Sequence, residues 1–190
     1  MTQQIFTLIL DTITYLYLFL ILLRFILQVS RADFYNPISQ FIVKASNPVV
    51  VPLRRVIPGF GGVDVATLLF ALVFQAVMLA IKFLVVAGGL PDIGSLIALS
   101  VLLVLGMILK LYFFALIIMI ISSWIAPGSS NPALMLVNQI CEPVMAPFRK
   151  ILPAMGGLDL SPIFAFLVLQ ILAIVLNGLS QQFGMSFSLL

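Results

Sequence analysis

The sequence predicts an all-α integral membrane protein built as a tandem duplication. Of its 190 residues, 63% are hydrophobic and only 8% are charged, and the mean hydropathy is +1.30. A soluble domain of this length cannot bury so much apolar side chain, so lipid must be the solvent for much of the surface. The duplication is indicated by residues 47–64 (NPVVVPLRRVIPGFGGVD), which recur as residues 142–159 (EPVMAPFRKILPAMGGLD) at an offset of 142 − 47 = 95 residues.

The duplication covers the whole chain, because prolines, glycines and charged residues match at this offset without a gap. The matching residues are Asn36, Pro37, Pro48, Pro52, Arg54, Pro58, Gly61, Gly62 and Asp64 in the first copy, and Asn131, Pro132, Pro143, Pro147, Arg149, Pro153, Gly156, Gly157 and Asp159 in the second. Chance similarity between apolar helices would not align such residues. We therefore expect two repeats, residues 1–95 and 96–190, related by an axis along the membrane normal.

Each repeat contains two predicted membrane spans. They lie at residues 5–27 and 63–87 in the first repeat and at residues 95–122 and 160–179 in the second. Every one of these runs reaches the roughly 20 apolar residues that a helix needs to cross a hydrocarbon core about 30 Å thick.

The segment between the spans of each repeat, residues 36–58 and 131–153, predicts a kinked amphipathic helix in the membrane interface. An asparagine can cap its start, and a proline is well tolerated at the first helical position. The two inner prolines, Pro48 and Pro52 or Pro143 and Pro147, are expected to end one short helix and kink the next. The alternative is a re-entrant segment packed between the spans.

Basic residues predict the orientation. Six of the nine lysines and arginines fall between the spans of a repeat: Arg31, Lys44, Arg54, Arg55, Arg149 and Lys150. By the positive-inside rule, both proline segments face the cytoplasm and both termini face away from it. The basic pairs Arg54-Arg55 and Arg149-Lys150 are placed to bind anionic lipid headgroups, or else a cytoplasmic partner.

Three charged residues, Asp11, Lys82 and Lys110, lie within apolar runs, where an ionisable side chain is a functional candidate. Asp11 and Lys82 lie at similar depths, about 9 and 7.5 Å from one end of their antiparallel spans, which predicts an ion pair. Lys110 lies near the middle of its span. Arg24, near the end of the first span, is expected to extend its guanidinium to the interface.

The duplicated motif also predicts an ion pair at each corner between the proline segment and the following span. Arg54 and Asp64 lie ten residues apart, as do Arg149 and Asp159. The intervening Gly-Gly turn would bring each carboxylate beneath its arginine and lock the corner. The alternative is an arginine on lipid phosphate with the aspartate only capping the next helix. The GFGG at residues 59–62 could be compared with a potassium-channel filter, but a turn with positive φ is the better interpretation.

Composition argues against an enzyme, a cofactor or a metal site. The chain has no histidine and one cysteine, Cys141, so it lacks the usual general base and the ligands of a zinc site. The small net charge of +3 is scattered along the chain, which argues against nucleic acid as a partner.

The pattern NP…NP…P-x-R-R-x-x-P-x-x-G-G-x-D after a first membrane helix resembles the YggT (YlmG) family of bacteria and plastids. The stretch SRADFYNPISQFIVKASNPVVVPLRRVIP (residues 30–58) is similar to the bacterial inner-membrane members with two copies. One departure is Glu142, which replaces the asparagine before Pro143. The resemblance implies membrane helices, tolerance to osmotic shock, and roles ranging from cation uptake to complex assembly.

Two classes of function therefore remain. The first is a non-enzymatic inner-membrane organiser or assembly factor that supports osmotic-shock tolerance and holds lipids or membrane proteins. The second is a subunit of a small ion or solute channel or transporter. A homo-oligomer fits the second class, because four helices enclose little pore.

Overall fold

The computed structural model describes residues 1–151 and 159–183, which are helical apart from short turns. The helices are α1 (Thr2–Val29), α2 (Pro37–Val56), α3 (Val65–Ala87), α4 (Ile93–Ile125), α5 (Pro132–Ile151) and α6 (Ser161–Gln181). Three residues of the duplicated motif, Pro153, Gly156 and Gly157, lie outside the described residues.

Four of these helices, α1, α3, α4 and α6, are long and apolar enough to cross a membrane. This confirms the prediction of an all-helical chain with four candidate spans. Much of their apolar surface is exposed, as at Leu8 and Ile174, which are 67% and 70% exposed. Such a surface is stable only where lipid or another protein covers it.

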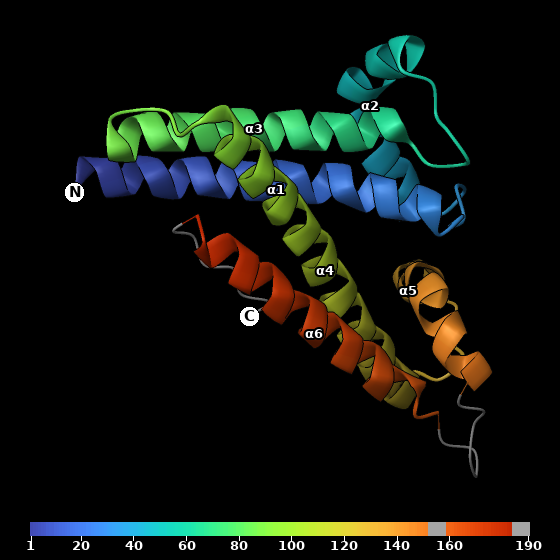
Figure 1. Cartoon of the computed structure of the whole chain (residues 1–190). Coiled ribbons are helices and arrows are strands. Elements are labelled where there is room, and N and C mark those ends of the chain that lie inside the picture. The colour runs from blue at the N-terminus through green and yellow to red at the C-terminus, as the bar shows by residue number, and fades with distance from the viewer. Residues whose placement is uncertain (152–158, 184–190) are drawn as a thin grey trace.

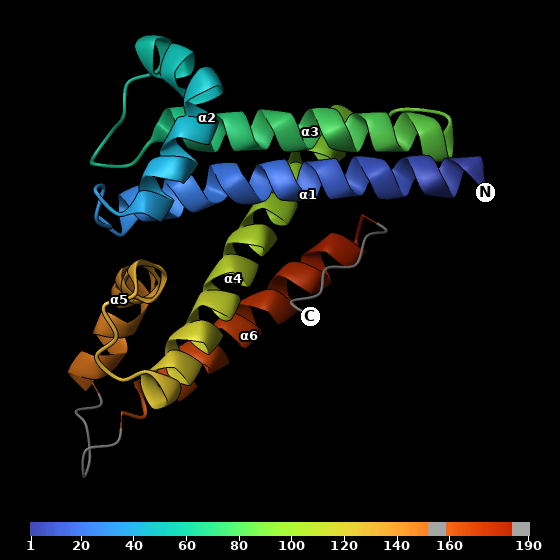
Figure 2. The ribbon, with the colours of Figure 1, turned by 180° about the vertical axis from the view of Figure 1, so that it is seen from behind.

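The two repeats have the same internal packing. In the first, α1 lies along α3, and α2 contacts both at their connected ends (Figures 1 and 2). In the second, α4, α5 and α6 make the corresponding contacts. The two pairs of spans are inclined to each other, and both views show α2 and α5 at the same end, away from the N-terminus. We call this end of the molecule the α2/α5 end.

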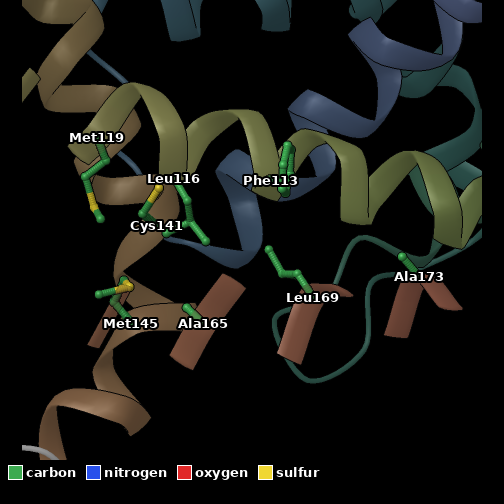
Figure 3. Packing of buried hydrophobic residues seen from close by; sticks show 8 residues of the cluster. All are labelled: Phe113, Leu116, Met119, Cys141, Met145, Ala165, Leu169 and Ala173. Carbon is green, nitrogen blue, oxygen red and sulfur yellow. The ribbon is translucent and has the colours of Figure 1, made fainter. Parts of the chain in front are cut away.

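Buried side chains of the described residues form three hydrophobic clusters. The first-repeat cluster joins α1, α2, α3 and α4 and includes Ile21 and Leu22. The second-repeat cluster joins α4, α5 and α6 (Figure 3), and we call it the sulfur-rich cluster because it contains Met119, Cys141 and Met145. Between the repeats, side chains of α1 and α2 meet those of α5.

The helices α2 and α5 correct one prediction, because each continues through its two inner prolines. Pro48 and Pro52 lie inside α2, and Pro143 and Pro147 lie inside α5. A proline removes one hydrogen-bond donor and crowds the preceding turn, but neighbouring bonds can hold the helix together. The two prolines of each helix are four residues apart, so both missing donors lie on one face and the other face stays intact.

Between α2 and α3, the chain reverses in a tight turn. Phe60 and Val63 exchange two backbone hydrogen bonds, of 3.2 and 3.0 Å, across Gly61 and Gly62. Both glycines have positive φ, at 61° and 83°, which is the pattern of a type I′ turn. The predicted turn is therefore present in the first repeat, and it directs the chain back to the start of α3.

Candidate functional site

The first-repeat corner joins three helices through Arg54 and Asp64. Asp64 caps α3, since Oδ1 accepts a hydrogen bond from the backbone N–H of Thr67 at 3.2 Å and Oδ2 accepts one from its hydroxyl. Arg54 of α2 donates to Oδ2 from Nε at 3.0 Å and also from Nη2. The same Nη2 donates to Oε1 of Gln28 in α1 at 2.6 Å. The structure thus contains the predicted ion pair together with the cap, and Gln28 extends it to α1.

Burial makes this corner energetically significant. Asp64 is only 2% exposed, and burial raises the pKa of its carboxyl group. Hydrogen bonds from Arg54 and Thr67 outweigh that effect and hold the pKa below its ordinary value. Asp64 therefore stays ionised. Because its folded-state pKa is depressed, its contribution to stability is present above the unfolded-state pKa and is lost as the pH falls through the folded-state value.

The second-repeat corner has the same pair in a more exposed setting. Arg149 donates from Nε to Oδ2 of Asp159 at 3.2 Å, and Asp159 Oδ1 accepts from the N–H of Ser161, the first residue of α6, at 2.9 Å. The side chain of Asp159 is 39% exposed. Arg149 also donates from Nη1 to Oε2 of Glu142 at 2.6 Å. The departure at Glu142 thus gives this arginine a second carboxylate.

The asparagine caps also lie where the sequence predicted. Asn36 accepts a hydrogen bond from the N–H of Ile38, and Asn131 accepts one from the N–H of Ala133, each at 2.9 Å. Asn36 makes a further contact, because its Nδ2 donates to the carbonyl of Pro132 at 2.7 Å. This bond ties the start of α2 to the start of α5, so the caps of the two repeats meet.

The predicted ion pair between Asp11 and Lys82 is present. Lys82 Nζ donates to both carboxylate oxygens at 2.8 and 2.9 Å, and the pair joins α1 to α3. Lys110 is different: it is partly buried near the middle of α4, and no hydrogen bond or ion pair reaches it from residues 1–151 or 159–183.

Arg24 corrects another prediction, because its guanidinium is buried rather than extended to the interface. The residue is 5% exposed, and Nη1 donates to the carbonyl of Val43 at 3.2 Å, to Oγ of Ser46 at 2.7 Å and to Oδ1 of Asn47 at 2.9 Å. All three acceptors lie on α2, which packs over this end of α1. The polar Ser46-Asn47 pair ahead of Pro48 is the signal that could have revealed this partner.

A cavity of about 390 Å³ lies beside Arg24 and Arg54, and we call it the arginine cavity. Its lining residues are Arg24, Leu27, Gln28, Ala32, Phe34, Ser39, Val43, Asn47, Val51 and Arg54. They come from α1, α2 and the turn that joins them. Ser39 is 3% exposed, and its Oγ has no hydrogen-bond partner in the described part of the chain.

Other basic residues of the motif are exposed. Lys44, Arg55 and Lys150 lie on α2 and α5 with accessible side chains, and no ion pair holds them within the described ranges. Exposed apolar side chains accompany them, among them Phe41 at 69% and Val56 at 80%. The α2/α5 end therefore combines basic and apolar surface.

Comparison with known proteins places these features in a family. The model of the CCB3/YggT family matches residues 3–85 and again residues 98–180, two segments separated by the same 95 residues as the duplicated motif. A protein of Pseudomonas aeruginosa, PA0392, is 54% identical over 179 residues, covering 93% of this chain and 91% of the relative.

The chain also resembles more distant relatives. YggT of Escherichia coli K12 is 40% identical over 166 residues, covering 87% of this chain and 86% of the relative. The chloroplastic YlmG homolog protein 2 of Arabidopsis thaliana is 38% identical over 65 residues, covering 33% of this chain and 24% of the relative. No solved structure matches the chain.

Proposed function

Because the chain belongs to the CCB3/YggT family of membrane proteins, we propose that it is a non-enzymatic organiser of the bacterial inner membrane that supports tolerance to osmotic shock. In this proposal, each repeat holds a helix, α2 or α5, in the membrane interface. The helices present a surface to lipid headgroups or to other membrane proteins.

The observation that carries the proposal is the duplicated corner. In each repeat an arginine of α2 or α5 pairs with an aspartate that lies just before the following span. Such a pair fixes the angle between a helix and the span beside it. A fixed angle is useful for a helix that must lie in the interface with its apolar face toward the acyl chains.

Anionic lipid is the partner that the α2/α5 end favours. Lys44, Arg55 and Lys150 are exposed there, and a cation near an anionic leaflet gains about 1 kcal/mol. Phe41 and Val56 are exposed on α2 and would enter the acyl region beside those cations. Together they give α2 an amphipathic surface suited to an anionic membrane.

A channel or transporter subunit is the second candidate, and Lys110 is the observation that favours it. An unpaired lysine near the middle of a span costs about 2.5–3.5 kcal/mol on insertion scales, so it is usually retained for function. An ion or solute path between copies of this chain would give Lys110 its polar surroundings.

Two assays on the same variants separate the candidates. In cells lacking the native protein, we expect the triple change Lys44→Gln, Arg55→Gln and Lys150→Gln to lower survival after osmotic downshift by at least about tenfold, since it removes roughly 3 kcal/mol of headgroup attraction, which is about a hundredfold in affinity. Lys110→Leu should preserve survival. Proteoliposomes should show ion and solute flux no higher than empty vesicles.

Flux above that background that is lost in Lys110→Leu would contradict the organiser and support the channel. Loss of survival in Lys110→Leu, with full survival of the triple variant, would also contradict the organiser and support the channel. The triple variant must reach the membrane in the same amount as the parent chain, which immunoblotting checks.

The proposed orientation places the α2/α5 end in the cytoplasm and both termini outside it. Single cysteines at Gln40 and Gln182, which are exposed, test it. In intact spheroplasts, an impermeant maleimide should label Gln182→Cys and spare Gln40→Cys.

The background for this labelling is Cys141→Ser. The native thiol is itself a poor target, because burial raises the pKa of Cys141 to about 12. Labelling of position 40 without position 182 would overturn the orientation. Permeabilised cells, in which both positions should react, are the control.

A further inference from the structure

The guanidinium of Arg24 is a buried cation whose contacts are all neutral. Its Nη1 donates to a carbonyl, a hydroxyl and an amide oxygen, and no hydrogen bond from Nε or Nη2 is found in residues 1–151 and 159–183. All six Asp and Glu side chains of the chain lie in that part, and none forms an ion pair with Arg24. Buried charges are normally paired, but Asp64, the carboxylate that attracts Arg24 at longer range, already pairs with Arg54, so no anion contacts Arg24 in the described ranges.

The arginine cavity brings further donors to the same place. Arg54 lines it from α2, and Ser39 contributes a buried hydroxyl that has no partner among the described residues. A buried hydroxyl without a partner costs about 1–3 kcal/mol, so a ligand that accepts its hydrogen bond recovers that cost. Two guanidinium groups and one unsatisfied hydroxyl therefore border a single cavity.

The equivalent place in the second repeat is lined by different residues. At the offset of 95 residues, Arg24 corresponds to Met119 and Ser46 to Cys141, and both second-repeat residues are packed in the sulfur-rich cluster (Figure 3). Asn47 corresponds to Glu142, which neutralises Arg149. At these positions the first repeat thus has two cations, Arg24 and Arg54, and one anion, Asp64. The second repeat has one cation, Arg149, and two anions, Glu142 and Asp159.

The geometry points to a phosphate-binding site: we propose that the arginine cavity binds a phosphate group between Arg24, Arg54 and Ser39. Guanidinium groups match phosphate oxygens in shape and charge, and a hydroxyl donor completes the set. The cavity volume falls within the roughly 300–1,000 Å³ of small-molecule pockets, which leaves room for more than a phosphate ion. Leu27, Phe34 and Val51 line the remaining space with apolar surface.

Two sources supply such a ligand: the headgroup of a membrane phospholipid and a soluble phosphate ester. The site does not depend on the proposed organiser function, because its lining residues all belong to the first repeat and do not include the exposed Lys44, Arg55 or Lys150. A channel subunit could carry the same site.

The test measures binding to the purified full-length chain in neutral detergent at constant ionic strength. The probes are a short-chain phosphatidylglycerol, glycerol 3-phosphate and inorganic phosphate, with chloride as the reference anion. The variants are Arg24→Met, which copies the second repeat, and Ser39→Ala. Arg55→Met is the control, since it removes an exposed arginine of α2 that does not line the cavity.

We expect at least one phosphate probe to bind. Arg24→Met should raise its dissociation constant by roughly tenfold or more and Ser39→Ala by about fivefold, as loss of a charged and a neutral hydrogen bond predicts. Arg55→Met should change it less than about twofold. Binding of the phosphatidylglycerol without glycerol 3-phosphate assigns the site to a phospholipid, and comparable binding of both assigns it to phosphate in general.

The proposal is overturned if no phosphate probe binds the parent chain, or if Arg24→Met and Arg55→Met weaken binding equally, which indicates non-specific attraction. If Arg24→Met fails to fold, unchanged binding in Ser39→Ala also overturns it. None of these outcomes depends on survival under osmotic shock or on flux, so this site and the proposed function are tested separately.

Discussion

Reversing either charge of the Asp11–Lys82 pair should sharply reduce the yield of folded protein, and reversing both together should restore it. Asp11→Lys would place two ammonium groups where Lys82 now contacts both carboxylate oxygens at 2.8 and 2.9 Å. Each unpaired charge in a span costs about 2.5–3.5 kcal/mol on insertion scales, and repulsion adds to that. The double variant keeps one charge of each sign between α1 and α3.

The measurement is the fraction of detergent-extracted protein that elutes as a single symmetric peak in size-exclusion chromatography. Lys44→Asp is the matched control, because it reverses a charge at an exposed position of α2 outside the spans. It should leave the elution profile unchanged. A double reversal no better than the worse single variant would show that the two charges act independently.

The spans and the duplication could be predicted from the sequence because lipid imposes simple requirements. A bilayer fixes the length and apolarity of a spanning helix, and those features are visible in any window of the chain. The pair of Asp11 and Lys82 follows from the same logic, since depth can be counted along antiparallel helices. These predictions needed no knowledge of how side chains pack.

The continuity of α2 and α5 could not be predicted in the same way. Prolines at two positions favour a broken helix in isolation, but here α2 packs on α1 and α3, and α5 packs on α4 and α6. Tertiary packing can hold together a helix that local preference would end. The backbone hydrogen bonds that remain on the face without prolines keep each helix continuous.

The burial of Arg24 could not be predicted from the positions at which the two repeats match. Arg24 stands opposite Met119 and Ser46 opposite Cys141, so the polar site occupies positions where the repeats differ. The burial of Ser39 was equally hidden, since a serine on a helix surface is usually exposed. Matching positions indicate the shared scaffold, whereas these differing positions indicate where one repeat has acquired a separate chemistry.

The first-repeat corner should show strong energetic coupling between Arg54 and Asp64. Arg54→Ala leaves a carboxylate that is 2% exposed without its guanidinium, and breaking a buried pair costs about 3–5 kcal/mol. Because the side chain of Arg54 is 40% exposed, we expect Arg54→Ala to lower the free energy of unfolding by the smaller amount of about 2–3 kcal/mol. Asp64→Ala loses the same pair and also the cap of α3, worth about 1 kcal/mol more. The double variant should be less destabilised than the sum of the two by about 1–2 kcal/mol.

The second repeat provides the matched cycle, Arg149→Ala with Asp159→Ala. Asp159 is 39% exposed and Arg149 keeps Glu142 as a partner, so the coupling there should stay below about 1 kcal/mol. Unfolding free energies from denaturant titration, in neutral detergent and in anionic lipid, measure both cycles. If the losses at the first corner are additive in both media, Arg54 and Asp64 are not coupled, and Asp64 acts only as the cap of α3. Coupling there that persists in anionic lipid would show that lipid phosphate does not replace Asp64 as the partner of Arg54, so the rigid corner survives in the membrane where it must hold α2.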